Sequence, residues 1–159
     1  MTEKIFSLPS AAETERFGAA LAAGLRGGDI VLLFGGSGAG KTALVQGAGR
    51  ALGVTEPITS PTFTLAAEYE AVAGGRRTRL IHLDLYRLTR TEEADVIGVD
   101  SFFHPDAIVM AEWPELIAAA AGPEALRLEI TGGGSEPRQI RLSCAEEYWG
   151  ERLSSFLRP

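Results

Sequence analysis

Residues 29–42 read DIVLLFGGSGAGKT, an apolar run that leads into a loop of glycines. Five consecutive apolar residues, 30–34, are typical of a strand that is buried on both faces. The end of the stretch has the form Gly35-x-x-x-x-Gly40-Lys41-Thr42, the complete Walker A pattern. We therefore predict a strand over Asp29–Phe34, then a phosphate-binding loop, and then a helix from Lys41 to about Leu52.

The residue types of this loop suit the phosphates of a nucleotide. Glycines let backbone amides approach phosphate oxygens closely, and the amides at the start of the next helix favour anions. The Lys41 ammonium can reach the β- and γ-phosphates, and the Thr42 hydroxyl can bind Mg²⁺. An accidental glycine-rich turn is the alternative, but a buried strand before it and a helix after it are the context the motif requires. The predicted binding residues are Gly36, Ser37, Gly38, Ala39, Gly40, Lys41, Thr42 and Ala43.

Two carboxylates follow apolar runs elsewhere in the chain. Asp84 comes after residues 80–83, and Glu112 comes after residues 108–111. A carboxylate at the end of a strand beside the phosphate loop is where Mg²⁺ or the attacking water is held. Asp84 and Glu112 are therefore candidates for the metal side of the site. Each of them could instead be a solvated residue at a strand end.

The rest of the pattern predicts an α/β fold in one domain, residues 1–159, because no linker or repeat interrupts it. Gly74-Gly75 and the glycines at 132–134 each read as the turn of a hairpin, so the central sheet should be mixed and partly antiparallel. The expected architecture is a three-layer sandwich like that of P-loop NTPases. Strands are expected at 29–34, 62–70, 79–85, 107–112, 126–131 and 139–144. Helices are expected between Ser10 and Gly27, at 41–52, between Thr89 and Gly98, at 114–121 and at 145–157.

Composition excludes several classes of protein. The longest apolar runs fall far short of the roughly 20 residues of a membrane span, and the N-terminus lacks the apolar segment of a signal peptide. Cys144 is the sole cysteine, so no internal disulfide forms, and we expect a cytoplasmic protein without membrane contact. The net charge of −6 argues against an unaided grip on nucleic acid. The absence of Asn removes the Asn-Lys-x-Asp motif that reads guanine, which favours ATP over GTP.

Three further motifs accompany the Walker A pattern. They are Ser60-Pro61-Thr62-Phe63-Thr64, His82-Leu83-Asp84-Leu85-Tyr86-Arg87 and Glu112-Trp113-Pro114-Glu115. In this order, and over nearly the whole chain, the four motifs resemble those of the TsaE family. The chain departs from the family at Gly36-Ser37, where Asp-Leu is more frequent, so any contact made by that Asp is in doubt.

The resemblance implies an ATPase that binds ATP and Mg²⁺ and hydrolyses ATP slowly on its own. It implies action with the proteins TsaD and TsaB, which make threonylcarbamoyladenosine in tRNA and which would hold most of the tRNA. It assigns catalysis to Lys41, Asp84 and Glu112, and the metal to Thr42, Glu112 and Asp84. Thr62 matches a switch-like segment that senses the γ-phosphate, and Trp113 matches the family's Trp beside the Walker B-like Glu112.

Some alternatives stay open at this point. Trp113 could be a rim or core aromatic, His82 is as easily a neutral core histidine as a catalytic one, and Arg87 could approach phosphate or pair with a carboxylate. Two other functions share the same loop. One is a small-molecule kinase, which needs an acceptor pocket and an arginine-bearing lid. The other is a non-hydrolytic nucleotide switch that serves as an adaptor.

Overall fold

Strand β2 (Ile30–Gly35) forms from the predicted apolar run and lies in the middle of the central sheet. The computed structural model describes residues 1–36, 38–61, 64–88, 90, 93, 98–133 and 136–157. Within these residues the sheet has seven strands in the order β1-β7-β6-β2-β5-β4-β3. The other strands are β1 (Thr2–Leu8), β3 (Ala66–Ala73), β4 (Arg76–Asp84), β5 (Ala107–Glu112), β6 (Leu126–Gly133) and β7 (Glu136–Cys144).

The sheet is mixed, as predicted. Strand β2 pairs in parallel with β5 and β6, and β4 pairs in parallel with β5. The hairpins β3–β4 and β6–β7 and the edge pair β1–β7 are antiparallel. Because β2, β4 and β5 run in the same direction, their carboxyl ends lie at one edge of the sheet, where the glycine loop begins.

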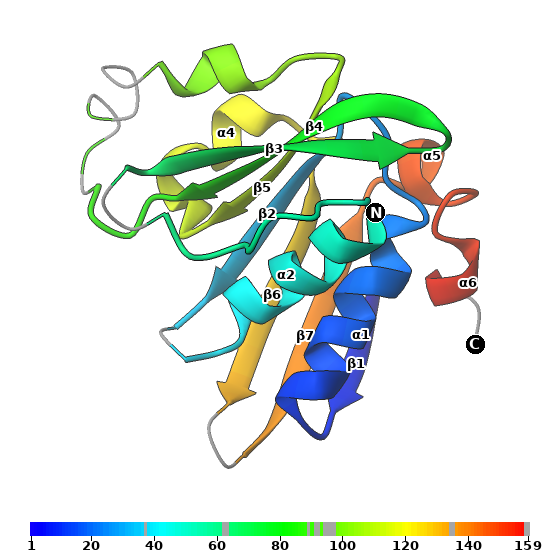
Figure 1. Ribbon diagram of the computed structural model, residues 1–159. Helices are drawn as coiled ribbons and strands as arrows, with labels where there is room; N and C mark the ends of the chain where they lie inside the picture. Colours follow the sequence, from blue (N-terminus) through cyan, green and yellow to red (C-terminus); the bar gives the residue numbers. More distant parts are fainter. Residues whose placement is uncertain are drawn as a thin grey trace.

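Helical segments cover both faces of the sheet and produce three layers (Figure 1). Helices α1 (Ala11–Ala22) and α2 (Lys41–Ala51) lie on one face. The other face carries η1 (Val99–Phe102), η2 (Pro114–Leu116) and α4 (Ala118–Ala121). Successive side chains of β2 alternate between the two cores, since Leu33 packs with the first and Leu32 with the second. The predicted fold class is confirmed.

The start of α1 follows the expected capping pattern. The Ser10 side chain accepts a hydrogen bond from the backbone N–H of Glu13 at 3.3 Å, which satisfies one of the free donors of the first turn. The helix ends earlier than Gly27, at Ala22. The helix after the glycine loop starts at Lys41 as predicted and ends at Ala51, one residue before the predicted end.

A buried ion pair fastens the C-terminal segments α5 (Glu146–Trp149) and α6 (Ser154–Leu157) to the start of β2. The two Nη atoms of Arg152 donate to the two carboxylate oxygens of Asp29 at 2.7 and 3.1 Å. The Tyr148 hydroxyl donates to the same carboxylate at 3.0 Å. Burial raises the pKa of that hydroxyl, and the Asp29 charge raises it further. The Asp29 side chain is completely buried, so these donors replace the water that it loses.

Several predicted elements are wrong in detail. Strand β1 was not predicted, because its alternation is short and interrupted by Lys4. The strand predicted at 62–70 begins at Ala66, since Leu65 has a φ of +67° that ends extended pairing before it. The helix expected between Thr89 and Gly98 falls mostly outside the described residues.

The two predicted C-terminal helical stretches are each divided. Residues 114–121 form the 3₁₀ turn η2 and the short α4, which meet at Ile117. Residues 145–157 form α5 and α6, and the chain between them contains Gly150 and the partly buried guanidinium of Arg152. Glycine weakens a helix interior by about 1 kcal/mol, and the bonds from Arg152 to Asp29 favour the bent path.

Candidate functional site

The candidate site lies where the carboxyl ends of three parallel strands meet the start of α2. Glu112 at the end of β5 is in register with Leu33 of β2 on one side and with Asp84 of β4 on the other. A cavity of about 380 Å³ opens at this point. It is lined by Gly38, Gly40, Lys41, Thr42, Ala43, Asp84, Tyr86, Glu112 and Trp113.

The glycine loop wraps the N-terminus of α2. Gly40, the residue before the helix, has a φ of +103°, a conformation that residues with a side chain rarely adopt. Within the described residues, no side chain caps this end of α2. The first amides of the helix are therefore available to an anion, which their partial positive charge attracts.

Lys41 is the cation of the site, and most of its surface is buried. Its Nζ donates to the carbonyl oxygen of Gly35 at 2.5 Å and lies 3.6 Å from the centroid of the Trp113 ring. Burial lowers the pKa of the ammonium below its ordinary value, although the charges of Glu112 and Asp84 offset part of that effect. The lysine is thus held inside the loop by one carbonyl and one aromatic face.

Glu112 receives hydrogen bonds from two different elements. The Thr42 hydroxyl donates to its Oε2 from the first turn of α2 at 2.9 Å. The Nε2 atom of His82 lies 2.5 Å from the same oxygen. Glu112 is 4% exposed and His82 is fully buried. The hydrogen bonds with Thr42 and His82 therefore replace those that the carboxylate would make with water.

The Asp84 carboxylate accepts hydrogen bonds from the segment that precedes β3 and from the turn that follows β4. The Ser60 hydroxyl donates to Asp84 Oδ2 at 2.6 Å, and the backbone N–H of Tyr86 donates to Oδ1 at 3.1 Å. Asp84 is 6% exposed, which corrects the alternative that it is a solvated residue at a strand end. Glu112 is buried as well, so the same alternative fails for both carboxylates.

Trp113 occupies a strained backbone position at the rim of the site. Its φ and ψ of 54° and 55° lie in the left-handed region, which is unfavourable for a bulky residue. Its ring packs against that of Tyr86 with the centroids 4.9 Å apart. The side chain is partly buried against the second core, as the rim or core interpretation expects, and its ring also lies over the Lys41 ammonium.

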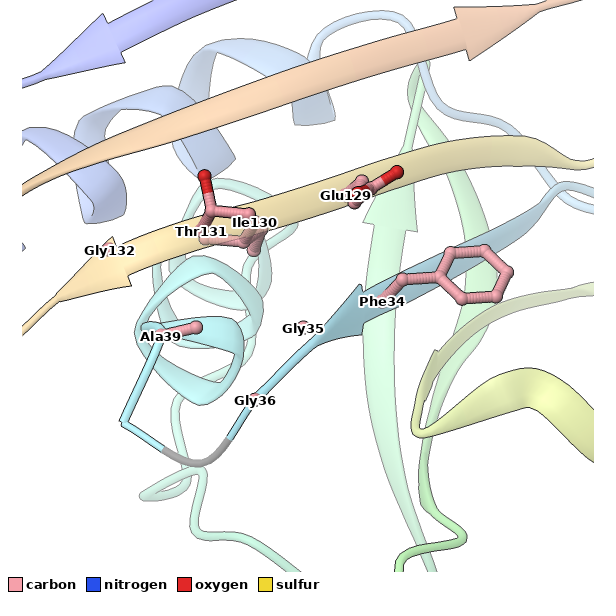
Figure 2. A pocket seen from close by; sticks show the side chains of 8 residues that line it. All are labelled: Phe34, Gly35, Gly36, Ala39, Glu129, Ile130, Thr131 and Gly132. Carbon is pink, nitrogen blue, oxygen red and sulfur yellow. The ribbon is translucent and has the colours of Figure 1, made fainter.

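The structure brings most of the predicted residues together, but not all of them. Gly36 and Ala39 line a second cavity, of about 510 Å³, between the ends of β2 and β6. Figure 2 shows Gly36 and Ala39 on one side of this cavity, and Ile130 and Thr131 of β6 among the lining residues on the other. Ser37 and Thr62 lie outside the described residues, so their predicted roles stay predictions.

Sequence reasoning left His82 undecided and did not single out Ser60. A signal for His82 exists in the sequence, because it stands two residues before Asp84 on a predicted strand and so shares its face. Ser60 stands in the Ser60–Thr64 motif, but the motif assigns it no contact. Its contact with Asp84 depends on the path of the chain between α2 and β3, which local patterns do not specify.

The side chains of the site suit a small divalent cation accompanied by phosphate. Among the described residues, no group of three or more His, Cys, Asp or Glu side chains is close enough to hold a metal alone. Thr42, Glu112 and Asp84 instead offer a hydroxyl and two carboxylates. Mg²⁺ prefers oxygen ligands and is commonly held by one or two carboxylates together with water and substrate phosphates. The donor set therefore fits Mg²⁺.

The sheet and its glycine loop define an α/β protein of the P-loop class. In the part of the chain that the structure describes, no helix is long and apolar enough to cross a membrane. The model of the family "Threonylcarbamoyl adenosine biosynthesis protein TsaE" matches residues 8–140. This chain belongs to the TsaE family.

Several relatives and one solved structure agree with this membership. The TsaE protein of Bacillus subtilis is 34% identical over 132 residues, which cover 83% of this chain and 80% of the relative. The TsaE protein of Streptomyces coelicolor is 35% identical, over 88% of this chain and 96% of its own length. Each is described as a tRNA threonylcarbamoyladenosine biosynthesis protein. The crystal structure of Bacillus subtilis YdiB superposes with a TM-score of 0.77 at 27% identity, over 97% of this chain and 93% of that one.

Proposed function

We propose that this chain is the ATP-binding and ATP-hydrolysing subunit of the system that makes threonylcarbamoyladenosine in tRNA, acting with TsaD and TsaB. One observation carries the proposal. Lys41 and Thr42 of the glycine loop line a single cavity with Asp84 and Glu112, which come from two other strands. Membership of the TsaE family supports a role in the threonylcarbamoyladenosine pathway. The residues that line the cavity support the binding and hydrolysis of ATP.

Each side chain has a part in this proposal. The amides of the glycine loop and the N-terminus of α2 bind the phosphates. The Lys41 ammonium leaves the Gly35 carbonyl for the β- and γ-phosphates, which bear full negative charge. Glu112 orients an attacking water or accepts its proton, and Asp84 completes the oxygen ligands. Trp113 covers the lysine and limits the access of bulk water.

Mg²⁺ fits beside Thr42, Glu112 and Asp84. When bound there, it would neutralise charge that develops on the phosphate oxygens. The protein's contribution is to hold these oxygen donors in place before the nucleotide arrives. The hydrogen bond between Thr42 and Glu112 already joins two of the three donors.

The kinase alternative finds little support in the fold. A kinase lid would need arginines that close over the phosphates. The cluster Arg76-Arg77-Thr78-Arg79 lies at the opposite end of β4 from Asp84, by the turn of the β3–β4 hairpin. The non-hydrolytic adaptor uses the same loop and requires an experiment.

Reconstituted modification of tRNA distinguishes the ATPase from the adaptor. The assay combines this chain with TsaD, TsaB, tRNA and the threonylcarbamoyl donor, and it compares Lys41→Ala, which lacks the phosphate cation, with Glu112→Ala, which keeps it. We expect both variants to fail in repeated turnover, and Glu112→Ala to bind ATP more tightly than Lys41→Ala. Full multiple turnover by Glu112→Ala without phosphate release would establish the adaptor instead.

A further inference from the structure

His82 is a fully buried imidazole in a part of β4 that faces the candidate site. It shares its face of the strand with Asp84, two residues further on. In the register of β4 and β5, His82 lies opposite Met110, so Glu112 is its diagonal neighbour on the same face. The two side chains meet across the sheet at 2.5 Å between Nε2 and Oε2.

The surroundings of the ring determine which nitrogen carries the proton. The Nδ1 atom of His82 is buried, and no hydrogen-bond partner for it is found among the described residues. A proton on Nδ1 would be a buried donor without an acceptor, at a cost of about 1–3 kcal/mol. A proton on Nε2 meets the Glu112 carboxylate, so the geometry places the proton on Nε2, and the ring donates to Glu112.

Two donors thus converge on one oxygen of Glu112. His82 approaches Oε2 from β4, and the Thr42 hydroxyl approaches it from α2. A carboxylate bonded at one oxygen from two rigid elements cannot rotate freely about its last side-chain bond. We propose that His82 is a positioning residue that fixes the Glu112 carboxylate, so that its second oxygen is presented to the metal or to the water.

This inference rests on the proposed function, because it assigns His82 a part in the metal-dependent step. It also explains why an imidazole occupies a place in the core of β4 where an aliphatic residue would pack without an unpartnered nitrogen. The neighbouring core residue Leu80, on the same face of the strand and fully buried, provides a matched control. It does not line the cavity.

The experiment uses the full chain with a non-hydrolysable ATP analogue and Mn²⁺ as a paramagnetic probe for Mg²⁺. The variants are His82→Leu, which cannot donate, His82→Gln, whose side-chain amide can donate to Glu112, and Leu80→Ala. Mn²⁺ affinity is measured by electron paramagnetic resonance, ATP hydrolysis by phosphate release, and folding by urea unfolding. His82→Leu is also made in the Glu112→Ala background.

We expect His82→Leu to weaken Mn²⁺ binding or hydrolysis by about 10–100-fold, the usual effect of removing a partner of a metal ligand. His82→Gln should restore most of the loss. Leu80→Ala should lower stability and leave Mn²⁺ affinity unchanged. In the Glu112→Ala background, His82→Leu should have no further effect.

Three results would overturn the inference. The first is wild-type Mn²⁺ affinity and hydrolysis in His82→Leu. The second is an equal loss in His82→Leu whether or not Glu112 is present, because that outcome indicates a purely structural role. The third is a wild-type protein that binds no nucleotide–Mn²⁺ complex, which removes the proposed function as well and is recognised before any variant is tested.

Discussion

At the scale of single residues, Lys41 is buried, and among the described residues its ammonium has one carbonyl and one aromatic ring as close partners. Its ammonium contacts the Gly35 carbonyl and the Trp113 ring. Neither partner carries a full negative charge, while the carboxylates nearby act on it at longer range. A phosphate entering the loop would offer a much stronger counterion, so nucleotide binding should draw on this residue directly.

Lys41→Ala should weaken ATP binding by about 10–100-fold, the value of one or two charge-assisted hydrogen bonds. Titration with a fluorescent ATP analogue measures the loss. Lys4→Ala is the control, because Lys4 is the chain's other lysine and lies on the edge strand β1. An unchanged affinity in Lys41→Ala would remove the assignment of the loop to phosphate.

Asp84 and Glu112 should differ in their effects on binding and turnover. The loop amides and Lys41 remain in both alanine variants, so ATP affinity should fall less than it does in Lys41→Ala. Hydrolysis should fall further, since a positioned general base is worth about 10²–10⁴-fold. Glu112→Ala should have the larger effect, because Glu112 is bonded to Thr42 and His82 whereas Asp84 is bonded to Ser60.

Calorimetry of ATP binding and phosphate release with TsaD and TsaB measure the two quantities on the same preparations. Ser60→Ala serves as a companion variant, because it removes a bond to Asp84 and keeps the carboxylate. Turnover at the wild-type rate in both Asp84→Ala and Glu112→Ala would show that the carboxylates are structural.

At the scale of elements, two glycines let α1 and α2 approach each other. A methyl group at Gly18 of α1 would collide with the carbonyl oxygen of Leu44, and one at Gly47 of α2 would collide with that of Glu15. Both obstacles are backbone atoms of a packed helix, so they cannot turn aside. The position of α2, and with it the glycine loop, depends on this close contact.

Gly47→Ala should therefore lower the free energy of unfolding by about 1–3 kcal/mol, as overpacking does, despite the better helix propensity of Ala. Gly49→Ala is the matched control, because its nearest obstacle is the terminal Cδ1 of Ile58, which can rotate away. Urea unfolding of both variants measures the difference. A Gly47→Ala protein as stable as the wild type would show that the helices have room to separate.

Elements with a strong local signal were predictable. Strand β5 matches its predicted bounds, Ala107–Glu112, because six buried residues follow one another in it. The positions of Asp84 and Glu112 after apolar runs indicated that both could lie near the glycine loop, but the strand order that brings them there is known only from the structure. Strand β1 has weak alternation, and its pairing with β7 joins the two ends of the chain, which no local pattern reveals.

Some features of the site depend on tertiary contacts and so lay beyond the sequence. The left-handed backbone of Trp113 and its position over Lys41 arise from the turn between β5 and η2. The bond from Ser60 to Asp84 depends on the long connection after α2. Patterns of two or three residues identify the chemistry of a group but not the partner that it meets.

At the scale of the whole molecule, segments near the two ends of the chain pack against the same core. Strand β1 extends the sheet beyond β7, and Phe6 of β1 packs edge-on against Phe17 of α1 and Phe156 of α6. The Asp29–Arg152 pair ties the C-terminal segments to β2. The strand that leads into the glycine loop is thus supported from both ends of the sequence.

The distribution of charge over the molecule bears on its relation to tRNA. The net charge is −6, and the densest basic cluster is at the β3–β4 hairpin. Within that cluster Arg79 is paired with Glu68 and Asp106, at 3.5 and 3.3 Å, which leaves Arg76 and Arg77 as its exposed members. Two exposed arginines form a small footprint for a polyanion.

The isolated protein should therefore bind tRNA weakly, with a dissociation constant above about 1 µM at physiological salt, the range of non-specific association. The affinity should have a shallow salt dependence, because each phosphate contact adds only about 0.9 to the slope of log K against log salt.

Arg76→Ala with Arg77→Ala should remove most of the residual binding, while Arg16→Ala, at an exposed arginine paired with Glu13 on α1, should not. A filter-binding titration at several salt concentrations measures both quantities. Addition of TsaD and TsaB should raise the affinity of the mixture without requiring Arg76 or Arg77. Submicromolar binding by this chain alone, with a steep salt slope, would mean that it carries the tRNA surface itself.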